Sequence, residues 1–534
     1  MKSSTTCRIK PYIQPFERTL ALRELEVVAG TKPEPVHAIH GEPECFRVRS
    51  KKTAVSLARA LAYWESVCDE HKITTLQSLR ESTVNVVRNG VPLDELAKKL
   101  PFQTDVPLPN RRCLRYATHG IHEYRGKFFP QLVRALINIA DVPKNGIIAD
   151  PFCGSGTTAV EAVLAGRRSL AIDMNPLSVF MAKAKCSVLR LPFQELEKKY
   201  TEVRSLLLST RKTESGKTWL SMLLSEDREY LQKWFAEEIL RELDQIATLI
   251  ERNTKGATRD FMFLCLSNIL RRVSWQREDD LRVRKELKPV DEIDPIKEFL
   301  EELGRSIRLV IAFLRQEPSP LKGVAEITEG DSKALSTHWK KWRGRVDVAI
   351  TSPPYATALP YLDTDRLSLC FLDLLKRSEH RDRDHEMIGN REITDKARKA
   401  LWEQFRQGNH KLPESITNLI LRIHHLNDKT DAGFRRRNLP SLLFKYFTDM
   451  QQVFAGLHEV LRPKASVFVV VGNNHTVAGG QRIDIPTIEF LAEVAQAVGF
   501  EPQEQIDMEM LVSRDIFRNN AIDSESILHF RKCQ

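Results

Sequence analysis

A glycine-rich turn between two short apolar runs constrains the fold of this chain most strongly. The first run, 146–150, leads into a turn that contains Gly154 and Gly156, and a second run, 168–173, follows about a dozen residues later. Glycine permits the close backbone approach and the unusual φ that such a turn requires. The pattern predicts a strand, the turn, a helix over 158–165 and a second strand. It is typical of a parallel α/β sheet.

Each of these two predicted strands ends in a carboxylate, first Asp150 and then Asp173. In nucleotide-binding α/β sheets, an acid at this spacing accepts hydrogen bonds from ribose hydroxyls. The helix after the turn also offers unpaired N–H groups at its N-terminus. The turn is neither a G-x-G-x-x-G dinucleotide loop nor a phosphate loop that ends in Gly-Lys-Ser/Thr. The sequence therefore favours a ligand without phosphates.

A second turn, Ser352-Pro353-Pro354-Tyr355, follows the apolar run 346–351. Each proline fixes its own φ and removes an N–H donor, and the residue before it is held extended. The oxygen atoms of this turn therefore stay free to accept. The arrangement suits a planar base with an exocyclic amine: Tyr355 stacks on the base, while the Ser352 and carbonyl oxygens receive its N–H groups. Taken alone, the tetrapeptide also fits a tight surface turn after a strand.

Together these motifs resemble those of the S-adenosylmethionine-dependent DNA amino-methyltransferases, which methylate exocyclic amines of cytosine or adenine. The family's catalytic motif is Asp, Asn or Ser followed by Pro-Pro and an aromatic residue, as at Ser352 to Tyr355. The resemblance covers roughly 117–186 and 322–534. The other matching segments are 119–132 before the first strand, 150–158 as the cofactor loop, 173–176 and 329–332 at the ends of strands two and three, and 461–472 around strand five.

The resemblance implies an α/β fold: a seven-stranded Rossmann-like class I methyltransferase sheet with a helical N-terminal region and helical and basic insertions. Ligands in such sheets bind at the carboxyl ends of the parallel strands. Asp150, Asp173, Asp331 and Ser352 all fall at such ends. The expected strands lie near 146–150, 168–173, 323–330, 346–351, 466–472, 501–509 and 525–531.

The same resemblance implies the site residues. The cofactor would be S-adenosylmethionine, and its methyl group, carried on a sulfonium, needs no metal for activation. His119 and His122 have a spacing compatible with a metal, but no further ligands cluster near them, so we expect them to be structural or to flank the cofactor. The expected catalytic residues are Ser352, Pro353, Pro354 and Tyr355. The expected cofactor-binding residues are Lys127, Phe128, Asp150, Phe152, Gly154, Gly156, Thr157, Asp173 and Asp331.

The resemblance leaves the target base open. Serine before Pro-Pro-Tyr is associated mostly with cytosine N4 in this family, whereas Asp or Asn goes more often with adenine N6. We expect a site-specific DNA methyltransferase for cytosine N4 that acts on double-stranded DNA in a restriction-modification or related defence system, with a possible cognate restriction endonuclease. The alternatives are an adenine-N6 enzyme, a tRNA amino-methyltransferase with a similar turn, and a non-catalytic protein that senses cofactor or binds DNA.

The gaps between motifs predict the domain organisation. Residues 376–437 hold fifteen Lys and Arg against ten Asp and Glu and end in Arg435, Arg436 and Arg437. Such a segment beside the base pocket would neutralise DNA phosphates, although a charged surface insertion is the alternative. The expected units are 1–110 (helical accessory region), 111–189 (cofactor-binding half), 190–321 (helical insertion), 322–375 (catalytic strand region), 376–440 (basic insertion for target recognition) and 441–534 (C-terminal part of the sheet).

Composition agrees with this interpretation. The chain of 534 residues is too long for one ordinary core, and its formal charge of +10 is compatible with a polyanionic partner. No apolar run is long enough to span a membrane, and the polar start lacks a signal peptide's apolar stretch. The nine cysteines form no C-x-x-C pair, which indicates a reducing cytoplasm as the location.

Overall fold

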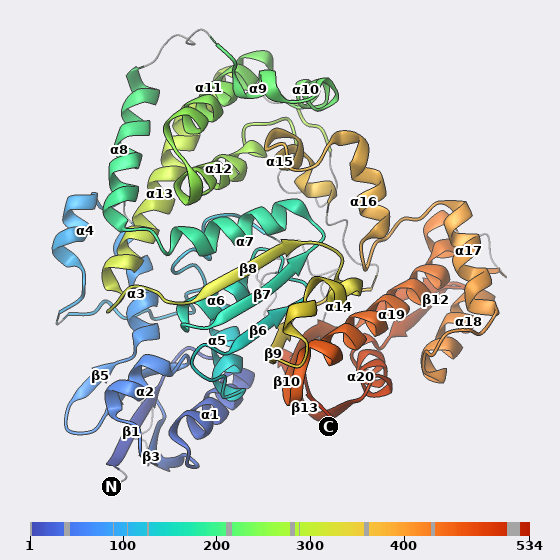
Figure 1. Cartoon of the computed structure of the whole chain (residues 1–534), viewed down its shortest axis with the longest axis horizontal. Helices are drawn as coiled ribbons and strands as arrows, with labels where there is room; N and C mark the ends of the chain where they lie inside the picture. Colours follow the sequence, from blue (N-terminus) through green and yellow to red (C-terminus); the bar gives the residue numbers. More distant parts are fainter. Residues whose placement is uncertain are drawn as a thin grey trace.

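A computed structural model gives the fold of the chain (Figure 1). It describes residues 3–36, 43–88, 90–103, 105–124, 126, 128–209, 216–277, 284–287, 289–356, 362–428, 433–509 and 524–533. Within these ranges no helix is both long and apolar enough to cross a membrane.

The central sheet has seven strands in the order β13-β14-β10-β9-β6-β7-β8. Neighbouring strands from β10 to β8 are parallel, whereas β14 is antiparallel to both β10 and β13. Numbered in chain order, the strands lie in the order 6-7-5-4-1-2-3 across the sheet. The strands are β6 (Ile147–Asp150), β7 (Arg168–Asp173), β8 (Val324–Glu329), β9 (Val346–Thr351), β10 (Leu461–Gly472), β13 (Phe500–Glu509) and β14 (Ser524–Lys532). The predicted α/β sheet is confirmed.

Alternating side chains of the central strands bury both faces of the sheet. In β10, Val467, Val469 and Val471 pack in one core cluster with residues of α19 (Phe434–Val460) and α20 (Thr487–Ala497). Phe468 and Val470 pack in another cluster with α5 (Pro130–Ile139) and the N-terminal region. Because successive strand residues point to opposite faces, helices must cover both sides. This burial fixes the strand register and therefore the residues that reach the carboxyl edge.

The N-terminal region corrects the prediction of a helical unit over 1–110. Its helices are α1 (Pro15–Ala29), α2 (Ala54–Ala60), α3 (Leu76–Val87) and α4 (Leu93–Lys99). The region also holds a five-stranded antiparallel sheet in the order β2-β3-β1-β4-β5. Its strands are β1 (Ser3–Ile9), β2 (Glu34–Val36), β3 (Cys45–Ser50), β4 (Trp64–Cys68) and β5 (Lys72–Thr74).

The reason for the error is local. The polar run of β1 buries Thr5 and Cys7 on alternate positions, a period that its Ser and Thr residues conceal in a hydropathy pattern. Helix α2 ends at Ala60, and Trp64 is already the first residue of β4.

Two insertions interrupt the methyltransferase sheet. The first, between β7 and β8, folds as helices around a large apolar cluster, which it shares with α7 (Pro176–Val188) and with the segment 362–375 after β9. The second follows β9 and runs into α19, so the boundary predicted at residue 440 falls inside that helix. The first contains α8 (Phe193–Ser209), α9 (Trp219–Met222), α10 (Ser225–Gln232), α11 (Glu237–Asn253), α12 (Gly256–Leu270) and α13 (Pro295–Gln316). The second contains α15 (Arg366–Phe371), α16 (His380–Glu386), α17 (Asp395–Arg406) and α18 (Glu414–Asp428).

Candidate active site

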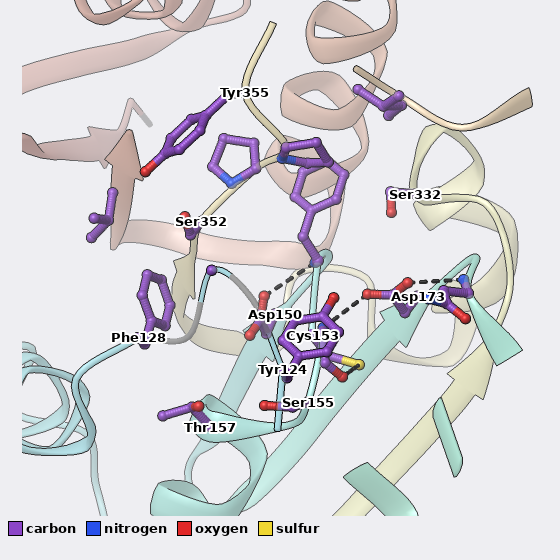
Figure 2. Close-up of a pocket in the computed structure, with 18 of the residues that line it drawn as sticks. Tyr124, Phe128, Asp150, Cys153, Ser155, Thr157, Asp173, Ser332, Ser352 and Tyr355 are labelled. Atoms are coloured by element: carbon purple, nitrogen blue, oxygen red, sulfur yellow. Dashed lines mark hydrogen bonds between the residues drawn. The ribbon is translucent and has the colours of Figure 1, made fainter. Parts of the chain in front are cut away.

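A cavity of 330 Å³ opens at the carboxyl ends of β6, β7, β8 and β9 (Figure 2). It collects residues from the two motif regions that lie about 200 positions apart in the chain. Its walls include Tyr124, Phe128, Phe129, Asp150, Phe152, Cys153, Gly154, Ser155, Thr157, Asp173, Met174, Asn175, Asp331, Ser332, Ser352, Pro353, Pro354, Tyr355, Met387, Ile388, Val470, Met508 and Glu525. Lys127, which the resemblance assigned to the cofactor site, lies outside the described residues.

The glycine-rich turn forms one wall and needs both of its glycines. Gly154 has φ +46°, and a Cβ there would come within 2.9 Å of the Tyr124 ring. Gly156 has φ +84°, and a Cβ there would lie 2.6 Å from Cβ of Ala182. A side chain at either position would therefore be strained and would collide with a neighbour. The turn leads directly into α6 (Thr157–Leu164), whose first residue, Thr157, lines the cavity.

Asp173 closes the turn against the end of β7. One carboxylate oxygen, Oδ2, accepts a hydrogen bond of 2.8 Å from the Gly154 N–H, and Oδ1 accepts one of 2.9 Å from the Asn175 N–H (Figure 2). Part of the side chain remains open to the cavity, yet burial of the carboxyl raises its pKa to about 6. A carboxylate has about four lone-pair sites, so Asp173 retains capacity for a ligand hydroxyl.

Asp150 connects the glycine-rich turn to the Ser-Pro-Pro-Tyr turn. Its Oδ1 accepts hydrogen bonds from the Thr351 hydroxyl at 2.7 Å and from the Phe152 N–H at 3.1 Å. The side chain is buried, and this burial raises its pKa to about 6 despite those hydrogen bonds. Because Thr351 immediately precedes Ser352, the Asp150–Thr351 bond ties the end of β6 to the start of the Ser-Pro-Pro-Tyr turn.

Asp331 and Ser332 follow β8 and form the wall beyond Asp173. The Asp331 carboxylate accepts a hydrogen bond from the Lys333 N–H at 2.9 Å and pairs with the Lys333 ammonium at 3.0 Å. The buried Ser332 hydroxyl donates to the Pro151 carbonyl, which fixes this segment to the turn after β6. The ends of three neighbouring strands are therefore joined to one another around the cavity.

The Ser-Pro-Pro-Tyr turn lines the cavity opposite this wall. In Figure 2, Ser352 and Tyr355 lie to one side of Asp150, and Asp173 and Ser332 lie to the other. Within the described ranges, neither the Ser352 hydroxyl nor the Pro353 carbonyl has a hydrogen-bond partner. Two acceptor oxygens are thus available at the cavity, as the sequence predicts for this turn.

Two features of the cavity were not predicted. The first is Glu525 on β14, which lines the cavity and accepts a hydrogen bond from the Tyr355 hydroxyl. No sequence signal marks it, because the antiparallel position of β14 beside β10 brings it to the site from the end of the chain.

The second unpredicted feature is a contribution of the second insertion to the cavity wall. Met387 and Ile388, which follow α16, line the cavity, and Gly389 adopts φ +78° beside Pro354 and Tyr355. The Lys333 and Lys445 ammonium groups each donate to the Glu386 carbonyl at 3.4 Å. The insertion is therefore attached to the site by its backbone as well as by apolar packing.

The remaining polar candidates near the site are structural. His119 Nε2 lies 2.9 Å from Glu161, which also binds Tyr116 and Arg134. Burial opposes ionisation of Glu161, but the Arg134 charge and these hydrogen bonds lower its pKa to about 2. In the part of the chain that the structure describes, no group of His, Cys, Asp and Glu side chains could hold a metal ion.

Arg435, Arg436 and Arg437 do not line the cavity. They lie exposed in the first turn of α19, and Arg435 contacts Glu392 at 3.5 Å. The sequence placed them at the end of an insertion, whereas the structure places them on the helix that covers one face of the sheet.

Known proteins match parts of this chain. The family model described as the RMKL-like methyltransferase domain matches residues 122–248. Type II methyltransferase M.BsoBI of Geobacillus stearothermophilus is 26% identical over 439 residues, 74% of this chain and 82% of that protein. Type II methyltransferase M.MvaI of Kocuria varians is 28% identical over 423 residues, 75% of this chain and 86% of that protein. A tRNA (guanine(10)-N2)-dimethyltransferase of Methanocaldococcus jannaschii is 40% identical over 66 residues, 12% of this chain and 17% of that protein.

The sheet order, the cavity and these matches define the class of the protein. It is a methyltransferase of the Rossmann-like α/β fold, and S-adenosylmethionine is its cofactor. The residues fit that group: Gly154 lines the cavity without a side chain, and the Asp173 carboxylate opens to it. Gly156, also expected to bind the cofactor, packs against Ala182 and is not among the residues that line the cavity.

Proposed function

We propose that this protein is a site-specific DNA methyltransferase that transfers a methyl group from S-adenosylmethionine to the exocyclic N4 amine of cytosine in duplex DNA. The observation that carries the proposal is the shared cavity, in which the glycine-rich turn, Asp173 and the Ser-Pro-Pro-Tyr turn meet. The two relatives that match most of this chain, both named Type II methyltransferases, support it.

The cofactor half of the cavity would hold S-adenosylmethionine, which supplies an electrophilic methyl group on a positively charged sulfonium when bound. We assign Asp173 to its ribose hydroxyls, because a carboxylate at the end of the second strand accepts such bonds in nucleotide-binding sheets. Asp331, at the end of the third strand, would approach the adenine ring. Phe128 and Phe152 would supply apolar walls, and Thr157 lies at the N-terminus of α6.

The catalytic half would act on the amine. The lone pair of an exocyclic amine is delocalised into the base, which makes the nitrogen a poor nucleophile. The Ser352 hydroxyl and the Pro353 carbonyl would accept hydrogen bonds from its two N–H groups, draw the nitrogen toward tetrahedral geometry and free the lone pair. Positioning, and dipoles directed at the charge that develops on nitrogen, would supply most of the acceleration.

The base must leave the duplex to enter this cavity. Tyr355, part of the cavity wall, would stack on its face and offset an unstacking cost of roughly a few kcal/mol. The exposed Arg435, Arg436 and Arg437 would bind phosphates and hold the DNA near the site.

Two other targets use the same chemistry. Adenine N6 is also an exocyclic amine. A serine hydroxyl can accept a hydrogen bond from its N–H group as well as from that of cytosine N4. The 66-residue match to a tRNA guanine methyltransferase favours RNA as the next candidate. A role in a restriction-modification system would further require a cognate endonuclease.

One assay separates these targets. The purified protein is incubated with methyl-labelled cofactor and either plasmid DNA or tRNA, and the modified nucleoside is identified after hydrolysis. We expect label in N4-methyl-deoxycytidine. Label in N6-methyl-deoxyadenosine would replace cytosine with adenine, and label in tRNA alone would refute the DNA assignment.

A further inference from the structure

The Tyr355 side chain is held at its far end by a residue that no motif contains. Its hydroxyl donates a hydrogen bond to Oε1 of Glu525. Glu525 is on β14, across from Gly472 at the end of β10, and its side chain lines the same cavity. The pair therefore joins the turn after the fourth strand of the sheet to its antiparallel strand.

This hydrogen bond restricts the orientation of the Tyr355 ring, which the backbone of the turn does not fix. The two prolines hold the main chain of the turn, but the torsion that rotates a tyrosine ring is broad. A hydrogen bond at the hydroxyl, the atom farthest from the backbone, selects one ring orientation. A ring that is already in place when the base arrives loses less entropy on binding.

The environment of Glu525 keeps the bond strong. Burial raises the pKa of the Glu525 carboxyl, and the hydrogen bond from Tyr355 acts in the opposite direction. Among the residues that the structure describes, the Tyr355 hydroxyl is the one hydrogen-bond donor to the Glu525 carboxyl, and a buried carboxyl left without a partner is costly.

We propose that Glu525 is a positioning residue for methyl transfer, which orients the Tyr355 ring for stacking on the extruded base. The inference rests on the proposed function, because it concerns the base that enters the cavity. Glu525 acts through Tyr355 and not on the cofactor, so its removal should lower kcat and leave cofactor affinity nearly unchanged.

The test compares Glu525→Ala, Glu525→Gln, Tyr355→Phe and the double variant Tyr355→Phe/Glu525→Ala in steady-state methylation of DNA. We expect Glu525→Ala to lower kcat about tenfold while KM for the cofactor changes less than about twofold. Glu525→Gln keeps an acceptor oxygen and should lose clearly less activity than Glu525→Ala. The double variant should be no worse than either single one, because both remove the same bond. Glu501→Ala, an exposed glutamate on β13 outside the cavity, is the matched control.

Three outcomes would overturn the proposal: unchanged kcat in Glu525→Ala, additive losses in the double variant, or an equal loss in Glu525→Gln, which would make the charge and not the orientation decisive. Crystal structures of the wild type and Glu525→Ala test the same point without activity. The Tyr355 ring should be displaced in the variant, and an unmoved ring would refute positioning even if the wild type methylated no DNA. A wild type that methylates no DNA would count against the proposed function and not against the positioning of Tyr355 by Glu525.

Discussion

At the scale of single residues, the site depends on glycines, which lack a Cβ, as much as on polar side chains. Gly156 lies against Ala182 of α7 (Pro176–Val188), so that the turn after β6 can pack on the neighbouring helix. Asp150 and Asp173 are carboxyls whose pKa burial raises to about 6. Burial around the cavity thus disfavours the negative charge of these two carboxyls, which would strengthen their hydrogen bonds to a ligand.

We expect Gly156→Ala to destabilise the fold. The new Cβ would meet Ala182 at 2.6 Å and the residue would keep φ +84°, so the loss should be about 3 kcal/mol in the free energy of unfolding. Gly166→Ala is the control, because Gly166 has φ +67° with nothing within 4 Å of a Cβ. It should lose only about 1 kcal/mol from the backbone conformation. Equal losses in urea denaturation would show that the contact with α7 is unimportant.

The Asp150 carboxyl should make stability depend on pH. Its folded pKa of about 6 lies above the value of about 3.9 for an unfolded aspartate, so its contribution is complete below about pH 4 and is lost as the pH rises through about 6. Asp150→Asn keeps an acceptor for Thr351 but does not titrate. Relative to wild type, the variant should therefore gain about 2 kcal/mol between pH 4 and pH 8. A difference in unfolding free energy that stays constant across this range would contradict the assignment.

At the scale of elements, the end of each strand determines what the site contains. Sequence patterns locate β7 and β9 at the residues found, because short apolar runs between turn signals mark buried strands clearly. They also place Asp173 and Ser352 at strand ends. They do not place Glu525 or Met387 at the site, since the position of the antiparallel strand β14 between β10 and β13 and the path of an insertion depend on tertiary packing. The N-terminal sheet was missed because the polar residues of β1 hide its alternation.

The segment 387–389 should couple the second insertion to catalysis. A Cβ at Gly389 would lie 2.8 Å from the Tyr355 carbonyl oxygen and 2.9 Å from Cβ of Pro354. Gly389→Ala should therefore displace the catalytic turn and lower kcat by about tenfold or more. Gly408→Ala, in the same insertion with φ +68° and open space around it, should leave kcat unchanged. Similar kcat values for the two variants would show that the contact with the turn does not matter.

At the scale of the whole molecule, the chain places exposed positive charge on the helix that follows the second insertion. The sheet and its two covering layers hold the cavity, whereas Arg435, Arg436 and Arg437 lie outside it in α19. The proposed function assigns phosphate binding to these arginines, and phosphate-binding side chains position a duplex without reading its sequence.

Replacement of these three arginines by serine should weaken DNA binding and leave cofactor binding intact. The slope of log affinity against log salt concentration should fall by about 1 for each phosphate that the variant no longer neutralises. Serine at the exposed Arg47, Arg49 and Lys51 of the N-terminal region removes the same charge and serves as the control. Equal changes in the salt slope for the two triple variants, measured by fluorescence anisotropy, would indicate non-specific attraction only.

The shared cavity is tested most directly by comparing cofactor binding and methylation in Tyr355→Ala. Tyr355 and Asp173 both line the cavity, and the proposed function assigns Tyr355 to the base and Asp173 to the cofactor. Calorimetry should give a cofactor Kd within about threefold of wild type, while methylation of DNA should fall at least about a hundredfold because the base loses its stacking partner. Parallel loss of cofactor affinity and activity would contradict the division of the cavity into a cofactor half and a base half.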